Sequence, residues 1–407
     1  MTEPAFIPFS RPSIGEEEIN EVVATLRSGW LTSGPRTAQF EHDFRAYVGA
    51  EAALAVNSCT AGLHLALAAL NIRPGDEVIT TPLTFCATVN VILHVGATPV
   101  LADVGADGNI DPGSCAARVT DRTRALIPVH LGGLPCEMDA LWSLARRHRL
   151  SVIEDAAHAA GAHYRGRPIG AGSATARSDA VAFSFYATKN LTTGEGGMIT
   201  THDTSLADRM RVFCLHGISK DAWNRYTDQG DWYYQVLGAG FKYNLSDIQA
   251  AIGLQQLRKL ERFIEIRARY AQLYHRAFAD VAEVECAPDR ASCRHAWHLY
   301  MLRLNLERLE IDRAEFIRAL RRKHIGASVH FIPVSLHPFF ARYAGRPENH
   351  CPGALALYPR LVSLPLYPAM TEDQVEYVAA SVKEIVRGAR KTKAVSIAAG
   401  RPAGGLP

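Results

Sequence analysis

The chain has 407 residues, which is enough for one large domain and a smaller one. Its formal net charge is only +3, and this gives no support to nucleic acid or an anionic membrane as a partner. Hydrophobic residues make up 48% of the chain, but no apolar run approaches about 18 residues and the first residues do not resemble a signal peptide. We therefore expect no transmembrane helix and a cytoplasmic protein. The eight cysteines are scattered without a Cys-x-x-Cys pair, which predicts reduced thiols and no zinc site.

Two helices are the first predicted elements. Residues 14–26 carry acidic side chains in their first turn, and Ser13 is a candidate cap. A turn-rich loop at residues 29–35 leads to a second helix at residues 39–48. The pattern of the sequence changes after this helix.

Short apolar strands then alternate with helices over about residues 50–200. This alternation argues for a parallel or mostly parallel sheet with helices on both faces. The predicted strands are residues 53–56, 76–80, 98–103, 124–129, 151–155 and 180–185, and the predicted helices are residues 63–70, 84–95 and 138–149.

A turn of small residues, residues 57–62, opens the helix predicted at residues 63–70. Exposed amides and the helix dipole bind anions well at such a start. An ordinary capped turn between a strand and a helix has a similar composition, so both interpretations stay open.

Lys189 follows the apolar run of residues 180–185, and two glycines, Gly196 and Gly197, close the turn behind it. A lysine at the end of a buried strand loses hydration, which lowers its pKa and frees the amine as a nucleophile. That suits a Schiff base with pyridoxal phosphate (PLP), and Ser184 can offer a hydroxyl to an anion. The alternative is a lysine that extends from a strand end to solvent.

Three further side chains are candidates for the same site. Asp155 ends a predicted parallel strand, and the carboxyl edge of such a sheet faces the ligand. A carboxylate there can keep a pyridine nitrogen protonated, although Asp155 could equally cap a following helix. His158 lies one turn farther on and Phe85 begins a helix, where it could stack on an aromatic ligand. Both also fit as core residues.

The later part of the chain has a different pattern. We expect a loop or hairpin at residues 229–244, a long helix that Ser246 caps at residues 247–278, and a domain boundary near residue 255. The other predicted elements are helices at residues 209–216, 313–324 and 371–387 and strands at residues 297–306 and 328–332.

Eight motifs occur along the chain in a characteristic order and spacing: Gly29-Trp-Leu-Thr-Ser-Gly-Pro35, Thr84-Phe-Cys-Ala-Thr-Val-Asn90, Gly96-Ala-Thr-Pro-Val100, Pro128-Val-His-Leu-Gly132, Ile153-Glu-Asp-Ala-Ala-His158, Phe183-Ser-Phe-Tyr-Ala-Thr-Lys-Asn190, Gly194-Glu-Gly-Gly197 and Tyr243-Asn-Leu-Ser-Asp-Ile-Gln-Ala-Ala251. Taken together, these motifs resemble the DegT/DnrJ/EryC1/StrS family of PLP-dependent sugar aminotransferases over about residues 5–387. The resemblance implies an α/β fold of PLP aminotransferase fold type I. Residues 1–255 would form a large domain with a mostly parallel seven-stranded sheet and residues 256–387 a small α+β domain, and residues 388–407 read as a disordered tail.

The family's ring-binding residues match four positions of this chain. Lys189 matches the lysine that forms the Schiff base, and Asp155 matches the carboxylate on the pyridine nitrogen. His158 falls where the family places Gln or His against the cofactor's hydroxyl, and Phe85 matches the aromatic residue that stacks on the ring. The resemblance implies PLP as cofactor.

The family's phosphate-binding residues also have counterparts. Thr60, the backbone of Cys59 and Ser184 match them, although the family usually has glycine or another small residue in place of the cysteine. Asn244 matches an asparagine that reaches the phosphate from the neighbouring subunit, which implies a homodimer with shared active sites. We expect four aromatic side chains to be buried in that interface: Trp232, Tyr233, Tyr234 and Phe241.

The resemblance further implies a nucleotide-sugar substrate, a keto hexose or pentose aminated most often at carbon 4, with glutamate as amino donor in surface polysaccharide or glycoside biosynthesis. Thr32, Ser33 and His330 are the expected substrate contacts by position. A PLP-dependent sugar dehydratase and a non-catalytic PLP-binding regulator are the alternatives. The dehydratases have histidine at the position of Lys189, so the lysine favours an aminotransferase.

Overall fold

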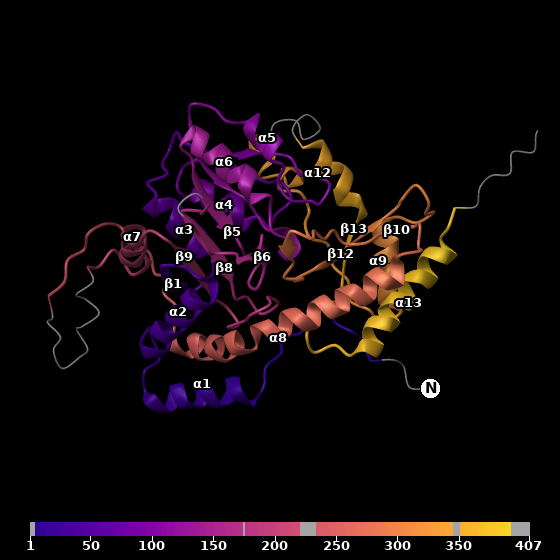
Figure 1. Ribbon diagram of the computed structural model, residues 1–407, viewed down its shortest axis with the longest axis horizontal. Coiled ribbons are helices and arrows are strands. Elements are labelled where there is room, and N and C mark those ends of the chain that lie inside the picture. The colour runs from indigo at the N-terminus through magenta and orange to yellow at the C-terminus, as the bar shows by residue number, and fades with distance from the viewer. Residues whose placement is uncertain (1–4, 174–175, 220–232, 345–350, 392–407) are drawn as a thin grey trace, which may run out of the picture.

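The computed structural model describes residues 5–173, 176–219, 233–344 and 351–391 (Figure 1). Its centre is a seven-stranded sheet in the order β1-β9-β8-β5-β4-β2-β3. Strand β9 runs antiparallel to both of its neighbours, and the other pairs are parallel, which confirms the mostly parallel sheet. The strands are β1 (Ala52–Val56), β2 (Glu77–Thr80), β3 (Thr98–Leu101), β4 (Thr123–Ile127), β5 (Ser151–Asp155), β8 (Ala180–Ser184) and β9 (Gly197–Thr201).

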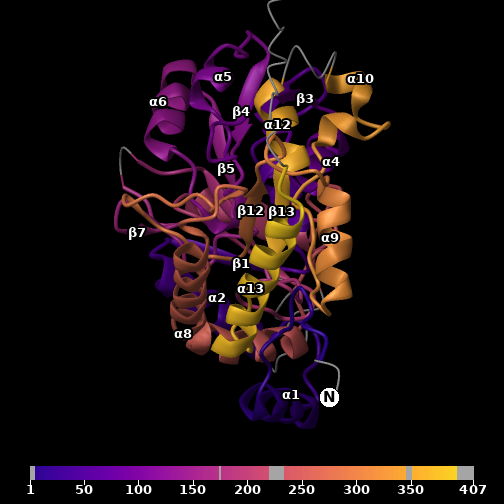
Figure 2. The ribbon, with the colours of Figure 1, turned by 90° about the vertical axis from the view of Figure 1, so that its right-hand side faces the viewer.

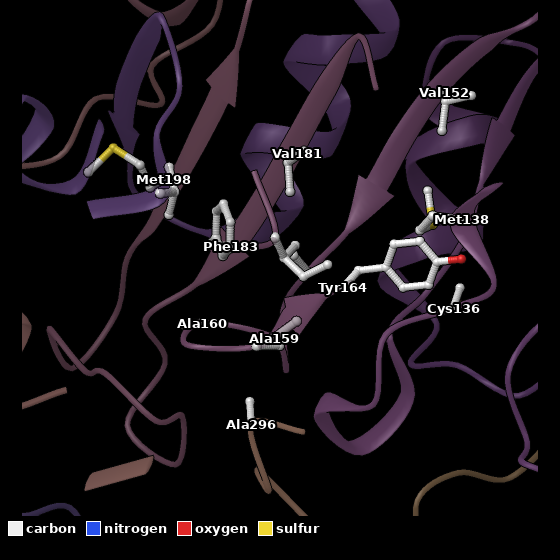
Figure 3. Packing of buried hydrophobic residues seen from close by; sticks show 14 of the residues in the cluster. Cys136, Met138, Val152, Ala159, Ala160, Tyr164, Val181, Phe183, Met198 and Ala296 are labelled. Carbon is white, nitrogen blue, oxygen red and sulfur yellow. The ribbon is translucent and has the colours of Figure 1, made fainter. Parts of the chain in front are cut away.

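Helices cover both faces of this sheet because successive strand residues point to opposite sides. Val181 and Phe183 of β8 belong to one apolar cluster, with helices α2 (Pro35–Val48), α6 (Met138–His148) and the first half of α8 (Asp247–Phe278). Figure 3 shows Phe183 and Met198 on neighbouring strands of this face. Ala180 and Ala182 belong to the opposite cluster, with helices α3 (Cys59–Ala69), α4 (Ala87–His94) and α7 (Thr204–Cys214).

A further apolar cluster surrounds a three-stranded antiparallel sheet in the order β10-β12-β13. Helices α9 and α13 pack beside one another on it (Figure 2). Ile7, near the N-terminus, joins this region through a bridge to Ile325. The elements are β10 (Val284–Glu285), β12 (Tyr300–Leu304), β13 (Leu361–Leu364), α9 (Arg313–Arg322) and α13 (Glu372–Gly388).

Helix α8 connects the two regions without a break near residue 255 (Figure 1). Ser246 caps it as predicted, because its hydroxyl accepts from the amide of Gln249. Side chains up to Ile264 pack in the cluster of the large sheet, whereas those from Tyr270 onward pack in the cluster of the small sheet. The division of the chain into domains at residue 255 stays a prediction. The tail predicted at residues 388–407 begins too early, because Gly388 ends α13, Ala389 is buried and Arg390 makes a bridge to Leu309. From residue 392 onward the predicted tail lies outside the described residues.

The remaining elements are short or peripheral. Helix α1 (Glu16–Ser28) packs on α8 and begins after Gly15, whose amide donates to the Glu18 carboxylate, so Ser13 is not its cap. None of the helices in the described ranges combines the length and hydropathy needed to span a bilayer. The others are α5 (Pro112–Ala116), α10 (Ala341–Ala344), α12 (Pro352–Leu357), β6 (His163–Tyr164), β7 (Arg167–Pro168) and β11 (Cys293–Arg294).

The strand predicted at residues 328–332 is wrong. Ser328 makes one bridge to Ser363, and the chain then leaves the sheet so that His330 and Phe331 line a cavity. Phe331 is therefore part of the wall of the cavity and not of a strand. Strand β13 was missed, because Leu361–Leu364 is short and follows two small helical turns.

Candidate active site

A cavity of about 510 Å³ opens at the carboxyl ends of the parallel strands. Asp155 is the last residue of β5 and Ser184 the last of β8, so the topology brings both to one edge of the sheet. The small-sheet region supplies the opposite wall through His298, His330 and Phe331. Most of the predicted site residues line this cavity: Cys59, Thr60, Phe85, Asp155, His158, Ser184, Lys189 and His330.

Lys189 lies in a turn just beyond β8. Its amide donates to the carbonyl of Tyr186, and the next side chain, Asn190, donates to the carbonyl of Ala296, which ties the turn to the segment before β12. Burial lowers the pKa of Lys189 to about 8, although Cys59 and Asp155 act in the opposite direction. The turn therefore presents an amine with a lowered pKa to the cavity.

Asp155 is buried at the base of the cavity. Thr88 Oγ1 donates to its Oδ2 at 2.8 Å, and the amide of Ala157 donates to its Oδ1 at 3.1 Å. Burial raises the pKa of Asp155, and these hydrogen bonds and the charge of Lys189 lower it. Turns rather than a helix follow β5, so Asp155 caps no helix.

His158 has a fixed tautomer. Its Nδ1 accepts a hydrogen bond of 3.2 Å from the amide of Gly132, so the proton of the neutral ring is on Nε2. Burial lowers the pKa of His158 well below its usual value, which keeps the ring neutral. A Cβ on the neighbouring Gly133 would lie 2.8 Å from the His158 carbonyl, and Gly133 has a φ of +97°, so this contact requires glycine. His158 thus offers an N–H donor.

The start of helix α3 forms another wall. The helix begins at Cys59, four residues before the predicted start, and Ser58 caps it by accepting from the amide of Ala61 at 3.1 Å. The amides of Cys59 and Thr60 are in the first turn, where a helix has no carbonyl to bond them. A Cβ on Gly197 would lie 2.7 Å from the Cys59 nitrogen, so this close approach depends on glycine at the start of β9. The arrangement can bind an anion.

The thiol of Cys59 points away from this turn. Its Sγ lies 3.5 Å from the carbonyl oxygen of Ala182 and 3.9 Å from Asp155 Oδ1. Two effects raise the pKa of the Cys59 thiol well above its usual value. Burial is the larger effect, and the charge of Asp155 is the second. The thiol is therefore neutral, and only the amide of Cys59 is available to an anion.

Aromatic side chains form the mouth of the cavity. Phe85 is 61% exposed, an unusual exposure for a phenylalanine, and its ring centroid lies 6.1 Å from that of Phe331. Phe331 in turn stacks against His158 at 5.7 Å. Such a wall leaves an apolar ring face free for a planar ligand.

Sequence reasoning missed several lining residues. His298 donates from Nδ1 to Asn190 Oδ1 at 3.3 Å, and its ring centroid is 4.5 Å from that of His158. The sequence feature that could have indicated His298 is a polar residue within the apolar run of residues 296–300. Thr88 was within a recognised motif but was not assigned a role. Tyr186 also lines the cavity and lies within the recognised motif of residues 183–190, but it was not assigned a role. Phe9 lines the cavity as well, and nothing in its local sequence indicates it.

Three predicted residues lie elsewhere. Asn244 donates to Ser33 Oγ at 2.7 Å, and Ser33 Oγ donates to the carbonyl of Leu245 at 2.5 Å. The carbonyl of exposed Thr32 accepts from the amide of Asp247. Ser33 and Asn244 border a separate cavity of about 210 Å³ beside α2 and α7. The hydrogen-bonded segments 32–37 and 242–247 therefore do not line the cavity that contains Lys189 of the same chain.

Three comparisons with known proteins give matches over nearly the whole chain. A model of the DegT/DnrJ/EryC1/StrS aminotransferase family matches residues 12–383. The spore coat polysaccharide biosynthesis protein SpsC of Bacillus subtilis is 52% identical over 386 residues, which cover 94% of this chain and 98% of that protein. The PLP form of the putative sugar aminotransferase Spr1654 from Streptococcus pneumoniae superposes with a TM-score of 0.87 at 32% identity over 94% of this chain and 99% of that one. Helicobacter pylori PseC, an aminotransferase involved in the biosynthesis of pseudoaminic acid, gives a TM-score of 0.86 at 29% identity over 95% and 100% of the two chains.

Proposed function

The chain belongs to the DegT/DnrJ/EryC1/StrS aminotransferase family, and we propose that it transfers the amino group of glutamate to a nucleotide-linked 4-keto hexose or pentose. It is a PLP-dependent sugar aminotransferase. The observation that carries the proposal is the convergence of Lys189, Asp155 and the start of α3 on one cavity. The similarity to a polysaccharide biosynthesis protein favours a role in making a surface polysaccharide.

The residues of this cavity fit PLP. The exposed ring face of Phe85 matches its planar ring, buried Asp155 matches its ring nitrogen, and the first turn of α3 with Ser184 matches its phosphate. When bound, PLP supplies an electron sink that weakens a C–H bond beside the reacting nitrogen. We assign Lys189, Asp155, His158, Phe85, Thr60, Ser184 and the Cys59 amide to the cofactor.

Lys189 is the residue that we expect to move protons. With its pKa lowered to about 8, part of the amine is neutral at pH 7 and the rest is protonated. The Nζ atom can therefore take a proton from the carbon that loses its amino group and deliver one to the sugar carbon that receives it. Asp155 would face the ring nitrogen as an ionised carboxylate and hold a proton on that nitrogen, and His158 would donate from Nε2 to an oxygen of the ligand. These roles need no other acid or base.

We also propose a homodimer with shared active sites. Thr32, Ser33 and Asn244 are joined by hydrogen bonds into one unit away from Lys189 of their own chain, which supports a contribution to a partner's site. Tyr233 and Tyr234 are 53% and 43% exposed and remain candidates for the interface.

The other two residues predicted to be buried in the interface are Phe241 and Trp232. Phe241 stacks on Tyr243 at 4.9 Å and lies 4.6 Å from His64 of the same chain, so it is already partly covered. Trp232 lies outside the described residues. Asn244 does not cap α8, since the hydroxyl of Ser246 does.

Mixed subunits test the shared site. Lys189→Ala and Asn244→Asp chains are each expected to be inactive, and a heterodimer places both changes in one site and leaves the other intact. After subunit exchange, activity should return to about a quarter of the wild-type value, because half of the dimers are mixed and each has one intact site. If no activity returns although mass spectrometry shows mixed dimers, Asn244 acts within its own subunit.

The reaction itself is tested with a panel of UDP-, GDP- and dTDP-linked keto-sugars and several amino donors. We expect an amino sugar and 2-oxoglutarate in equal amounts when glutamate is the donor, with Lys189→Ala as the inactive control. Conversion of the sugar without incorporation of nitrogen would indicate a dehydratase. Binding of PLP without any conversion would indicate a regulator.

A further inference from the structure

The carboxylate of Asp155 is held by a chain of two threonine hydroxyls. Thr88 Oγ1 lies 2.8 Å from Asp155 Oδ2, and Thr84 Oγ1 lies 2.8 Å from Thr88 Oγ1. Thr84 and Thr88 are 2% and 1% exposed. Because buried hydroxyls need hydrogen-bond partners, the Thr84 hydroxyl depends on Thr88 as its partner and the Thr88 hydroxyl depends on Asp155.

The direction of these hydrogen bonds follows from the group at their end. An ionised carboxylate can only accept, so Thr88 gives its proton to Asp155. The Thr88 oxygen then accepts from Thr84, which fixes the hydroxyl of Thr84 as the donor. Thr88 is in α4, where its branched side chain has few rotamers, so the helix holds the hydroxyl in place.

We propose that Thr88 is a positioning residue, whose hydroxyl is oriented by Thr84 and fixes Asp155 Oδ2 so that the carboxylate stays ionised and aligned with the cofactor's ring nitrogen. The inference rests on the proposed function, in which Asp155 is the partner of that nitrogen. Both threonines border the cavity, and their hydroxyls form hydrogen bonds with each other and with Asp155, so the inferred role of both is exerted through Asp155.

The groups around Asp155 show why this support matters. Burial raises the pKa of Asp155, and the Thr88 hydrogen bond is the largest effect that lowers it, followed by the Ala157 amide, Lys189 and His130. Cys59 is the other ionisable neighbour, and its thiol is neutral. Loss of the Thr88 hydroxyl should therefore raise the pKa of Asp155 further, so that the acid becomes protonated at a higher pH.

The test compares Thr88→Val with Thr88→Ser in the PLP-loaded enzyme. We expect Thr88→Val to shift the acid limb of kcat/KM upward by about one pH unit and to lower kcat by on the order of 10-fold, with KM little changed. The absorbance of bound PLP, titrated without substrate, should shift in the same direction. Thr88→Ser should restore both properties, and Thr84→Val should give a smaller shift of the same sign.

Thr80→Val is the matched control. Thr80 is also a fully buried threonine, and its hydroxyl donates to the carbonyl of Ile127 at 2.8 Å, away from Asp155. It should lose thermal stability without a shift of the pH profile or the spectrum. A folded Thr88→Val enzyme with the wild-type acid limb and spectrum overturns the inference. Wild-type turnover in Asp155→Asn would instead overturn the role of Asp155 in the proposed function.

Discussion

The two regions of the molecule supply side chains to the cavity from different kinds of backbone. The large sheet places Asp155 and Ser184 at the last positions of strands, where neighbouring strands fix them. The small-sheet region places His298, His330 and Phe331 on segments outside any helix or strand. We infer that the groups for bond making and breaking belong to the large-sheet region, here called the rigid side, which includes Lys189 in the turn just beyond β8. The small-sheet region, here called the irregular side, shapes the space for the substrate. Changes on the first side should mainly lower kcat, and changes on the second should mainly raise KM.

The largest effect is expected for Lys189→Ala. In the proposed function Lys189 is both the link to PLP and the proton-transfer group, so we expect removal of its amine to lower kcat by on the order of 10⁴-fold or more. Borohydride reduction followed by peptide mass spectrometry should place the pyridoxyl label of the wild-type enzyme on Lys189. A label on another lysine contradicts the assignment.

Asp155→Asn should have the next largest effect. The substitution keeps the shape but removes a buried charge, so kcat should fall by about 10²–10³-fold while the protein still binds PLP. Steady-state kinetics and the PLP absorbance measure both. Near-normal turnover would show that catalysis does not require the negative charge of Asp155.

The lowered pKa of Lys189 predicts how cofactor loading depends on pH. Only the neutral amine reacts with PLP, and burial lowers the pKa of Lys189 to about 8. The loading rate of the cofactor-free enzyme should therefore rise about 10-fold between pH 7 and a plateau above pH 8. Stopped-flow absorbance follows this reaction, and a rate that still rises at pH 10 would show an ordinary exposed lysine.

His330→Ala should have the smallest effect and sharpens the comparison. The His330 ring shares a hydrogen bond of 2.8 Å with Ser363 Oγ and stacks on Phe9 at 5.3 Å, and burial and Lys189 lower its pKa to about 4. We expect a rise of about fivefold in the KM of the sugar and little change in kcat. Ser363→Ala should reproduce part of the rise. A variant that turns over far more slowly while its KM stays at the wild-type value would place His330 among the groups that do the chemistry.

The sequence predicted the rigid side much better than the irregular side. The strand that ends at Ser184 is a continuous apolar run, and the strand that ends at Asp155 contains the apolar pair Val152 and Ile153 before two acidic residues. The position of a residue at a strand end follows from such local patterns. Helix α8 was also predicted closely, since its cap and its apolar spacing are local signals. The start of α3 was placed four residues late, because small residues fit a turn and a first helical turn equally well.

The irregular side could not be derived in the same way. Residues 328–332 were predicted as a strand, but the position of Phe331 depends on contacts with residues far away in the sequence, such as Phe85 and His158. Asn244 and Ser33 illustrate the same limit, because their contact joins positions 211 residues apart. Local periodicity contains no information on such pairs.

The continuity of α8 has a consequence for how the length of this chain can vary. Between Ile264 and Tyr270 the helix passes from one apolar cluster to the other, and there buried Arg267 donates to the carbonyls of Trp297, His298 and Leu366. Insertion or deletion of one residue at this crossing would rotate everything beyond it by about 100° and move it by about 1.5 Å along the axis. Tyr270, Tyr274 and Phe278 would then face the wrong way at once. Loops elsewhere can gain or lose residues. The length of α8, in contrast, is fixed, because it sets the position of one wall of the cavity relative to the other.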